Sequence, residues 1–217
     1  MKNILVTLCS IFMLSALAQD QDPKAKAILD DLSKTTKTYK TITSDFVLTM
    51  FNKDKKQTEK QTGKVVVKGQ MFKLEIPGNN IVCDGKTIWN YNKDAKEVTI
   101  KTYDPNNNDQ LNPSKIFTIY ETGFKYKYVA EEKVGTALCH EIDLFPSVDQ
   151  GKKKYHSIRI YIDKTKKQVV KMKVTMKDQS SNVYDIKGFK PNLEITDASF
   201  VFDTKPFKAD QIIDERD

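Results

Sequence analysis

Residues 81–91 read Ile-Val-Cys-Asp-Gly-Lys-Thr-Ile-Trp-Asn-Tyr. An Asp-Gly pair between two short apolar runs is a strong signal for a tight β-hairpin, because glycine readily adopts the positive φ that such a turn requires. We therefore predict a strand over 81–83, a turn at Asp84-Gly85 and a second strand over 87–91. This hairpin indicates an antiparallel sheet, and the pattern on either side extends it.

Apolar and polar residues alternate along most of the remaining chain, which is typical of strands whose two faces meet different surroundings. A polar turn is predicted over 52–61. Val170, Met172, Val174 and Met176 are expected on one face of a single strand. Further strands are predicted at positions that include 42–51, 64–68, 71–76, 98–101, 124–128, 138–144, 156–162, 170–176, 183–189 and 199–202.

Two segments have helical patterns instead. Residues 23–39 carry spaced apolar residues among lysines and aspartates, with a proline in the first turn, which predicts an amphipathic helix. Residues 103–113 are rich in Asn, Asp and Pro and are predicted to form a loop. A short apolar helix is predicted to follow at 115–120.

Consecutive antiparallel hairpins with few helices predict a mainly β fold. We expect an incomplete antiparallel β-barrel, that is, a strongly curved sheet of about 10–11 strands covered by a few short helices. Two short helices cannot cover so much sheet with a dense core, so an apolar cavity is expected. No repeat or linker divides the chain, and residues 19–217 are predicted to form a single domain.

The first 18 residues have the pattern of a secretory signal peptide. Lys2 precedes an apolar run that ends in Ala16-Leu17-Ala18, and polar residues follow. A basic start, a short apolar stretch and an Ala-x-Ala ending predict cleavage after Ala18 and export to the periplasm. An uncleaved membrane anchor is the alternative. Cys9 lies inside the apolar run, so the chain lacks the cysteine that a lipoprotein needs for its own acylation.

The charge of the chain limits its partners. The formal net charge is +7, yet only Arg159 and Arg216 among the 36 basic residues are arginines. Base reading favours the planar guanidinium fork, so this balance argues against nucleic acid as a partner. A lysine-rich surface suits contact with anionic membranes or acidic proteins.

The sequence contains few groupings typical of catalysis. Cys139 and His140 are neighbours and would point to opposite faces of a strand, so Cys139 with His156 is the one catalytic pair left open. Glu141 and Asp143 share a strand face, which is more typical of a solvated surface than of an acid–base pair. No metal-ligand spacing occurs. We therefore predict no catalytic residue, no metal and no cofactor.

Two cysteines lie beyond the predicted signal peptide. Cys83 and Cys139 each belong to an apolar run that is predicted to be a strand. An oxidising compartment permits a disulfide between them. Two buried, unpaired thiols are the other arrangement, and the sequence leaves both open.

The hairpin at 81–91 resembles the Asp-Gly-Lys-Thr-Leu-Trp-x-Tyr hairpin of the LolA family, whose members are periplasmic carriers of outer-membrane lipoproteins. The surroundings agree with this resemblance. Ser44-Asp45-Phe46 opens the first strand, and Gly63 begins the strand before 71–76. Near the end, Phe200-Val201-Phe202 and Pro206 resemble the family's closing motif. The resemblance covers nearly all of the predicted mature chain.

The resemblance implies an apolar cavity for acyl chains beneath a helical lid, and a chaperone-like role in lipoprotein transport and outer-membrane biogenesis without enzymatic activity. It implies acylated lipoproteins as cargo, an inner-membrane ABC-type complex as donor, an outer-membrane acceptor, and a monomer. Many members carry a basic residue followed by proline where this chain reads Lys68-Gly69-Gln70. The arginine that couples lid opening to ligand entry is therefore missing, and Lys68 or Lys73 are the candidates to replace it.

The predicted acyl-binding surface combines apolar side chains near the hairpin with those of segment 115–120. Strand alternation shows which residues share a face but leaves open which face is concave, and Trp89 could instead serve hairpin packing. Met172 and Met176 form a second group, because flexible thioethers suit variable contents. The full predicted set is Phe46, Leu48, Met50, Phe72, Leu74, Trp89, Tyr91, Ile116, Phe117, Ile119, Met172 and Met176.

Two other functions fit the same sequence pattern. A binding protein for a free lipid or another apolar ligand would have an identical cavity. A non-enzymatic envelope sensor or adaptor could use the same fold to bind a protein, and a dense core without ligand would favour that role.

Overall fold

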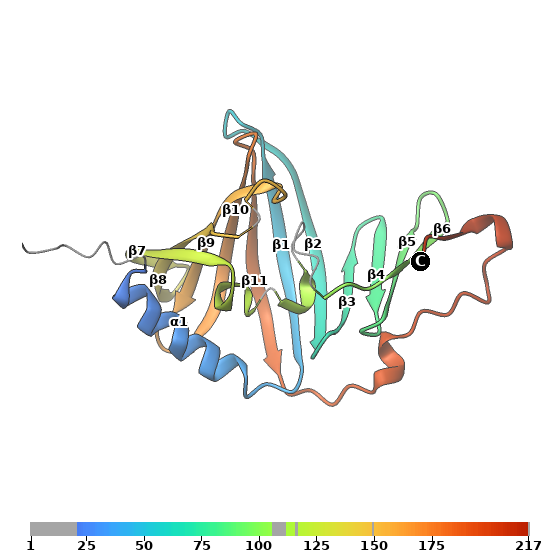
Figure 1. Cartoon of the computed structure of the whole chain (residues 1–217), viewed down its shortest axis with the longest axis horizontal. Coiled ribbons are helices and arrows are strands. Elements are labelled where there is room, and N and C mark those ends of the chain that lie inside the picture. Colours follow the sequence, from blue (N-terminus) through green and yellow to red (C-terminus); the bar gives the residue numbers. More distant parts are fainter. Residues whose placement is uncertain (1–20, 106–111, 116, 149, 217) are drawn as a thin grey trace, which may run out of the picture.

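Twelve strands form one curved sheet in the computed structural model of the protein, which describes residues 21–105, 112–115, 117–148 and 150–216 (Figure 1). The predicted mainly β fold with an incomplete barrel is confirmed. The strands are β1 Ile42–Phe51, β2 Gln57–Lys68, β3 Met71–Ile76, β4 Asn79–Cys83, β5 Thr87–Asn92, β6 Glu97–Thr102, β7 Phe124–Val134, β8 Ala137–Pro146, β9 Tyr155–Asp163, β10 Gln168–Met176, β11 Ser181–Pro191 and β12 Ile212–Asp214.

The sheet consists of two meanders, and the first strand of one is paired with the last strand of the other. β1 to β6 follow one another by hairpins, as do β7 to β11, and β1 then pairs antiparallel with β11 along its whole length. β12 adds to β6 in parallel. β7 and β12 are therefore the two edge strands, and the sheet remains open.

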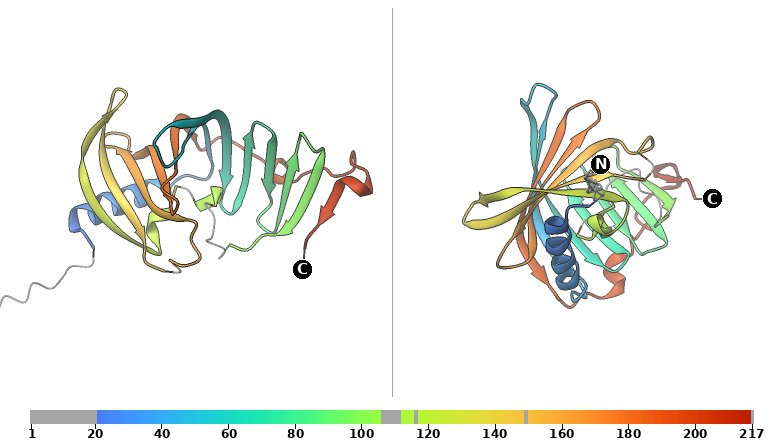
Figure 2. Two further views of the ribbon diagram at one scale, coloured as in Figure 1. Left: turned by 90° about the horizontal axis from the view of Figure 1, so that it is seen from above. Right: turned by 60° about the vertical axis from the view of Figure 1, so that its left-hand side comes forward.

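One helix, α1 Pro23–Thr36, covers the β7–β10 half of the sheet (Figures 1 and 2). The spacing of Ala25, Leu29 and Leu32 puts their side chains on one side of the helix, where all three are buried. We call the sheet face that they contact the inner face. The helix core consists of these three residues with Tyr120, Phe124, Ile142, Leu144, Tyr155, Ile158, Ile160, Ile162, Val169, Met172 and Val174.

A second cluster, the cover core, lies on the inner face of the β1–β4 half. It is continuous with the helix core, since Tyr184 of β11 packs against both. The register agrees, because Tyr184 pairs with Leu48 on one side and with Met172 on the other. The cover core consists of Ile42, Phe46, Leu48, Val65, Val67, Phe72, Cys83, Tyr103 and Phe117.

Asp22 fixes the start of α1 and ties it to the edge strand β7. Its carboxylate accepts the backbone N–H groups of Lys24 at 2.9 Å and Ala25 at 3.1 Å, and also that of Tyr128 at 2.9 Å. Pro23 suits the first helical position because its missing N–H would have no partner there. The Tyr128 and Ala25 hydrogen bonds hold the pKa of Asp22 below its usual range.

Replacing Asp22 with alanine should lower the free energy of unfolding by about 1–2 kcal/mol at neutral pH, because a helix cap is lost. The folded-state pKa is depressed, so this stabilisation is present above about pH 4, the usual aspartate value, and is lost as pH falls through the lower folded-state pKa. Urea denaturation of both proteins at neutral and acidic pH measures the difference. Asp30→Ala is the control, since its exposed pair with Lys26 should contribute at most about 0.5 kcal/mol. A constant difference down to pH 2 would contradict the prediction.

Five local predictions differ from the structure. The predicted helix 115–120 is instead two short 3₁₀ turns, η1 Pro113–Lys115 and η2 Ile119–Glu121, because Thr118 between them has a non-helical φ of −131°. The predicted strand 199–202 is wrong: η3 Asp197–Phe200 occupies its first two residues, and the other two belong to no strand. The predicted turn 52–61 is also too long, since β2 begins at Gln57 opposite Phe51.

The fourth difference is a face assignment in β10. The register with β9 shifts between Val169 and Lys171, which is a β-bulge. The extra residue turns Val169 rather than Val170 onto the inner face with Met172 and Val174. The helix 23–39 likewise stops earlier than predicted, at Thr36. The predicted signal peptide lies outside the described residues.

Candidate apolar binding site

The wall of the candidate site is the inner face of β1 to β4. Phe46 pairs with Gly63 across β1 and β2, and a Cβ built on that glycine would lie 2.3 Å from Phe46 Cζ. The ring therefore lies directly over the glycine, which leaves no room for any side chain there. Phe72 is 3% exposed and lies one strand further along. The wall is thus apolar and aromatic.

A short piece of chain crosses this wall, and we call residues 112–115 and 117–123 the cover segment. Phe117 is 6% exposed and packs edge-on against Phe189 of β11, with 5.8 Å between ring centroids. Tyr103 leads into the cover and packs against Phe72 at 6.3 Å. The Tyr103 hydroxyl accepts a hydrogen bond from Asn112 Nδ2 at 2.9 Å. The cover therefore rests on the wall mainly through two aromatic side chains.

The cover is also joined to α1. The Lys37 ammonium lies 3.1 Å from the carboxylate of Glu121, and the Ser33 hydroxyl donates to the same carboxylate. Both interactions are exposed, and exposed ion pairs contribute little stability. The link between the cover and the helix is therefore polar and weak compared with the apolar packing beneath it.

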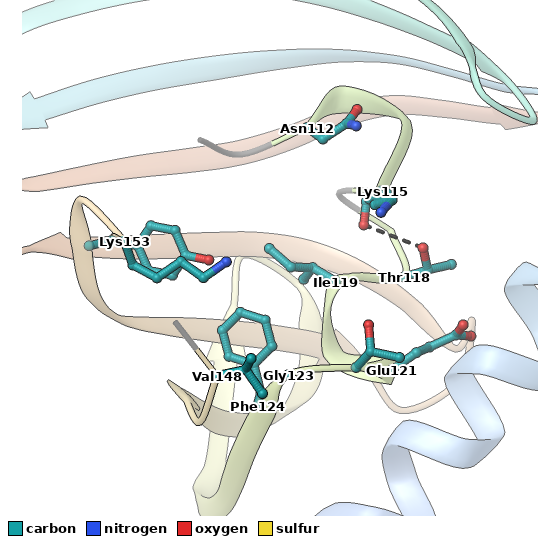
Figure 3. Close-up of a pocket in the computed structure, with 11 residues that line it drawn as sticks. Asn112, Lys115, Thr118, Ile119, Glu121, Gly123, Phe124, Val148 and Lys153 are labelled. Atoms are coloured by element: carbon teal, nitrogen blue, oxygen red, sulfur yellow. Dashed lines mark hydrogen bonds between the residues drawn. The ribbon is translucent and has the colours of Figure 1, made fainter. Parts of the chain in front are cut away.

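A cavity of about 350 Å³ lies between the cover and the residues that lead into β9 (Figure 3). This volume is at the low end for small-molecule sites. Aromatic residues form its floor, where Phe124 and Tyr155 stack with 6.4 Å between ring centroids. Burial raises the pKa of Tyr155. The lining is Asn112, Lys115, Thr118, Ile119, Glu121, Thr122, Gly123, Phe124, Val148, Lys153 and Tyr155.

The structure brings most of the predicted acyl-binding residues to the inner face. Phe46, Leu48, Phe72 and Phe117 belong to the cover core, and Met50 and Leu74 pack against it. Met172 belongs to the helix core, and Ile119 and Met176 pack against that cluster. Ile116 lies outside the described residues.

Trp89 and Tyr91 lie on the outer face. Cys83 pairs with Ile88, which packs against the cover core, whereas Val82 pairs with Trp89 on the opposite face. Tyr91 follows Trp89 by two residues and shares that outer face. Its ring lies 5.9 Å from that of Phe202 and 5.1 Å from that of Phe207. The two faces of this hairpin thus contact different parts of the chain.

Lys68 and Lys73, the candidates for the missing arginine, also lie on the outer face. Their neighbours Val67 and Phe72 pair with each other in the cover core, so the lysines point away from it. The Lys68 ammonium donates to Asp197 at 2.6 Å, and Lys73 pairs with Glu75. Neither ammonium faces the cover segment.

Several site residues were not predicted from the sequence. Tyr103 lies in the segment predicted to be a loop, and Phe189 belongs to a strand whose face could not be assigned. Tyr184 was missed for the same reason. Lys153 lies in a run of three lysines, 152–154, that carries no signal for burial, yet it is only 8% exposed. The one sequence feature that could have indicated Tyr103 is that it is an aromatic residue in an otherwise polar predicted loop.

The thiols and histidines do not form a reactive group. Cys83 on β4 and Cys139 on β8 are free and buried. Burial raises the pKa of Cys83 to about 11. Cys139 pairs with Asp163 of β9, and His156 lies about 23 Å further along that strand at 3.3 Å per residue. The possible pair of Cys139 and His156 is therefore not formed.

The carboxylates on the outer face of β8 have a structural partner. Arg159 Nε and Nη2 donate to Asp143 at 2.6 and 2.8 Å, and Nη1 contacts Glu141. Both carboxylates are thus neutralised by one guanidinium, and Glu141 is only 5% exposed, so this part of the strand face is not solvated as the sequence predicts. The described residues include no cluster of three metal-ligating side chains. Among these residues, no helix has both the length and the apolar character that a membrane crossing demands.

Solved structures have the same fold. An uncharacterized conserved protein from Thermus thermophilus is 15% identical, with 89% of this chain and 99% of that chain covered and a TM-score of 0.57. LprF from Mycobacterium bovis is 15% identical, with 81% and 97% covered and a TM-score of 0.50. The Mycobacterium tuberculosis lipoprotein LppX is 13% identical, with 81% and 99% covered and a TM-score of 0.50.

No curated protein sequence matches the chain. The family described as "Outer membrane lipoprotein carrier protein LolA" matches residues 37–203. This range extends from the end of α1, across the whole sheet except β12, to the segment after η3. The match covers most of the chain and includes the wall and the cover described above. The chain therefore belongs to the LolA family.

Proposed function

We propose that this protein is an exported, non-enzymatic carrier that shields the acyl chains of lipoproteins and transfers them from the inner to the outer membrane. Members of its family bind apolar ligands or lipoproteins. The donor in this proposal is an inner-membrane ABC-type complex, and the recipient is an outer-membrane acceptor. Export depends on the signal peptide predicted at residues 1–18.

Such a carrier has a clear physical purpose. Each methylene buried away from water is worth about 0.8 kcal/mol, so a sixteen-carbon chain costs roughly 12 kcal/mol to expose. Acylated proteins therefore do not leave a membrane unaided at a useful rate. A carrier must supply an apolar surface, and it must also release its cargo. Release requires that closing the empty carrier offsets part of the binding energy.

The observation that carries the proposal is the aromatic contact between the cover and the wall. In this structure Phe117 and Tyr103 occupy the apolar wall themselves, and the remaining cavity is about 350 Å³. An acyl chain that displaces these two side chains would contact the apolar wall in their place, and the protein would lose the packing of Phe117 and Tyr103 against it. The cover would then return to the wall when cargo leaves, which favours release.

Native mass spectrometry with lipid extraction tests the proposal. The mature protein is purified without detergent from the cells that make it. We expect a population that is heavier by the mass of an acylated polypeptide, and a measured N-terminus at Gln19. Uptake of a synthetic triacylated lipopeptide by the ligand-free protein provides the matching experiment in solution.

The other outcomes discriminate between functions. An adduct with the mass of a free lipid, without uptake of lipopeptide, would replace the proposal with free-lipid transport. A single peak at the bare mass, with no uptake of lipopeptide, would overturn both and leave a protein-binding adaptor. A mass that includes residues 1–18 would contradict the predicted signal peptide.

A further inference from the structure

Three turns lie next to one another at one end of the sheet. Residues 52–56 join β1 to β2, and residues 177–180 join β10 to β11. The register places these two turns side by side, because Phe51 at the end of β1 pairs with Ser181 at the start of β11, and the two hairpins project together in Figure 1. The end of β10 pairs in the same way with the start of β9, so the third turn, 147–154, adjoins them. We call these three turns the lysine rim.

The lysine rim carries a large share of the positive charge of the chain. It holds seven lysines and three aspartates, so more than half of the formal charge of +7 lies in these turns. Lys153 is buried and lies apart from the others. Over the described part of the chain, five further rim lysines are exposed and have no carboxylate within ion-pair distance, namely Lys53, Lys55, Lys56, Lys152 and Lys154.

Lysines at the opposite end of the same strands have partners. In the turn between β9 and β10, the Lys164 ammonium lies 2.6 Å from the carboxylate of Glu131, and the Lys167 ammonium lies 3.0 Å from that of Asp31. In the rim, by contrast, the carboxylate of Asp178 accepts from the backbone N–H and the hydroxyl of its neighbour Ser180. The exposed, unpaired lysines are therefore a property of one end of the sheet and do not follow from composition alone.

The chemistry of the rim fits a surface of many anionic headgroups better than it fits a protein. The three turns contain no arginine and no aromatic residue, which are the side chains that dominate protein–protein binding energy. Lysine is also depleted at such interfaces. A lysine ammonium acts as a point charge, and a cluster of lysines is attracted to an anionic membrane without any defined bonding geometry.

We propose that the lysine rim docks the protein on an anionic membrane surface. Val148 of the rim is 57% exposed and also lines the cavity under the cover. The backbone N–H of Ser147 donates to the carbonyl oxygen of Gly123, at the end of the cover segment, at 2.9 Å. Docking through the rim therefore brings the cover and its cavity close to the headgroups. The inference goes beyond the carrier function, because it adds a second surface that is distinct from the apolar wall.

Flotation with lipid vesicles tests the inference on the full mature protein. One set of vesicles contains phosphatidylcholine alone, and the other contains phosphatidylcholine and anionic phosphatidylglycerol in a molar ratio of about 3:1. We expect the anionic vesicles to bind at least about tenfold more tightly at low salt, and we expect high salt to abolish this preference by screening.

Two matched variants locate the docking surface, since each removes three lysines from one turn. Replacing all three lysines of the turn 52–56 with glutamine should weaken binding to anionic vesicles by about tenfold or more. Lys164→Gln with Lys166→Gln and Lys167→Gln, at the opposite end, should weaken it by less than about twofold. The backbone is matched as well, because Lys55 and Lys167 have similar positive φ angles of 60° and 52°.

Every other outcome contradicts membrane docking by the rim. Equal losses in the two variants would mean that net charge alone drives binding. Equal affinity for the two kinds of vesicle, or binding to neither, would also overturn the inference. Binding of polyglutamate that depends on the rim, without binding of vesicles, would assign the rim to an acidic protein instead. Uptake of the triacylated lipopeptide should be the same in all three proteins, so a failure of the carrier function would be seen separately.

Discussion

Replacing Phe200 with alanine should lower the free energy of unfolding by about 3–5 kcal/mol, the usual cost of emptying an aromatic core position. Phe200 is 0% exposed, although it lies outside both cores of the inner face. It belongs to η3, which contacts β3. Just before it, the Lys68 ammonium donates to the carbonyl oxygen of Ile195 at 2.8 Å and to Asp197.

The residues after Phe200 continue along the outer face of β5 and β6. Phe202 and Phe207 pack on Tyr91, Gln211 donates to the carbonyl oxygen of Lys96 at 3.0 Å, and β12 then pairs with β6. Phe200 is the fully buried residue of this C-terminal segment. Its loss should therefore weaken the attachment of the whole segment, not of one turn.

Urea denaturation measures the effect of Phe200→Ala. Val201→Ala is the matched control, because Val201 is adjacent and 58% exposed, and its substitution should change stability by at most about 0.5 kcal/mol. Acyl-chain binding by Phe200→Ala should be unchanged under native conditions, because the segment lies on the face opposite the cover. A loss of stability below about 1 kcal/mol would mean that the C-terminal segment does not support the sheet.

Most strands and their consecutive hairpins were readable from the sequence, whereas the pairing of β1 with β11 and the faces of the 81–91 hairpin were not. Strand alternation separates Ile88 from Trp89 but does not say which one faces the ligand side. In most sheets one face is polar, and this identifies the opposite face as the one that packs against the core. Here both faces of the hairpin are apolar, because the C-terminal segment covers the outer one. The information that places Trp89 outside thus lies more than a hundred residues further along the chain.

The segment 199–202 and the cover segment were misassigned for a related reason. Phe200-Val201-Phe202 alternates like a strand, yet the edge of β6 that could accept it pairs with β12 instead. Near 115–120 the apolar residues suggest a helix, but six residues cannot repay helix nucleation without good packing. The secondary structure of both segments is therefore determined by tertiary contacts, which local sequence patterns do not reveal.

The buried cation of the cavity is a further case. The run of three lysines at 152–154 is typical of a solvated turn, and nothing in its sequence distinguishes the middle residue. In the structure Lys153 lines the cavity under the cover, whereas Lys152 and Lys154 are exposed. The burial of this lysine can be found only after the fold is known.

Replacing Phe117 with alanine should make acyl-chain binding tighter while making the protein less stable. Phe117 packs on Phe189 and belongs to the cover core, so its truncation removes part of the closed state. Ligand affinity is reduced by the fraction of molecules that are not open, and weakening the closed state raises the open fraction. We expect an apparent Kd lower by about tenfold to a hundredfold, which corresponds to roughly 1.4–2.7 kcal/mol of lost closure energy.

Titration with dansyl-labelled undecanoic acid measures the apparent Kd, and urea denaturation measures the stability. Phe200→Ala is the decisive control, because it should lose comparable stability from the outer face without any change in Kd. If Phe117 formed part of the ligand-binding wall, its truncation would weaken binding instead, and the cover would not compete with the ligand. Equal changes of Kd in the two variants would mean that the effect follows global stability. A tighter apparent Kd for Phe117→Ala together with an unchanged Kd for Phe200→Ala supports a carrier in which the protein's own side chain occupies the ligand surface until cargo displaces it.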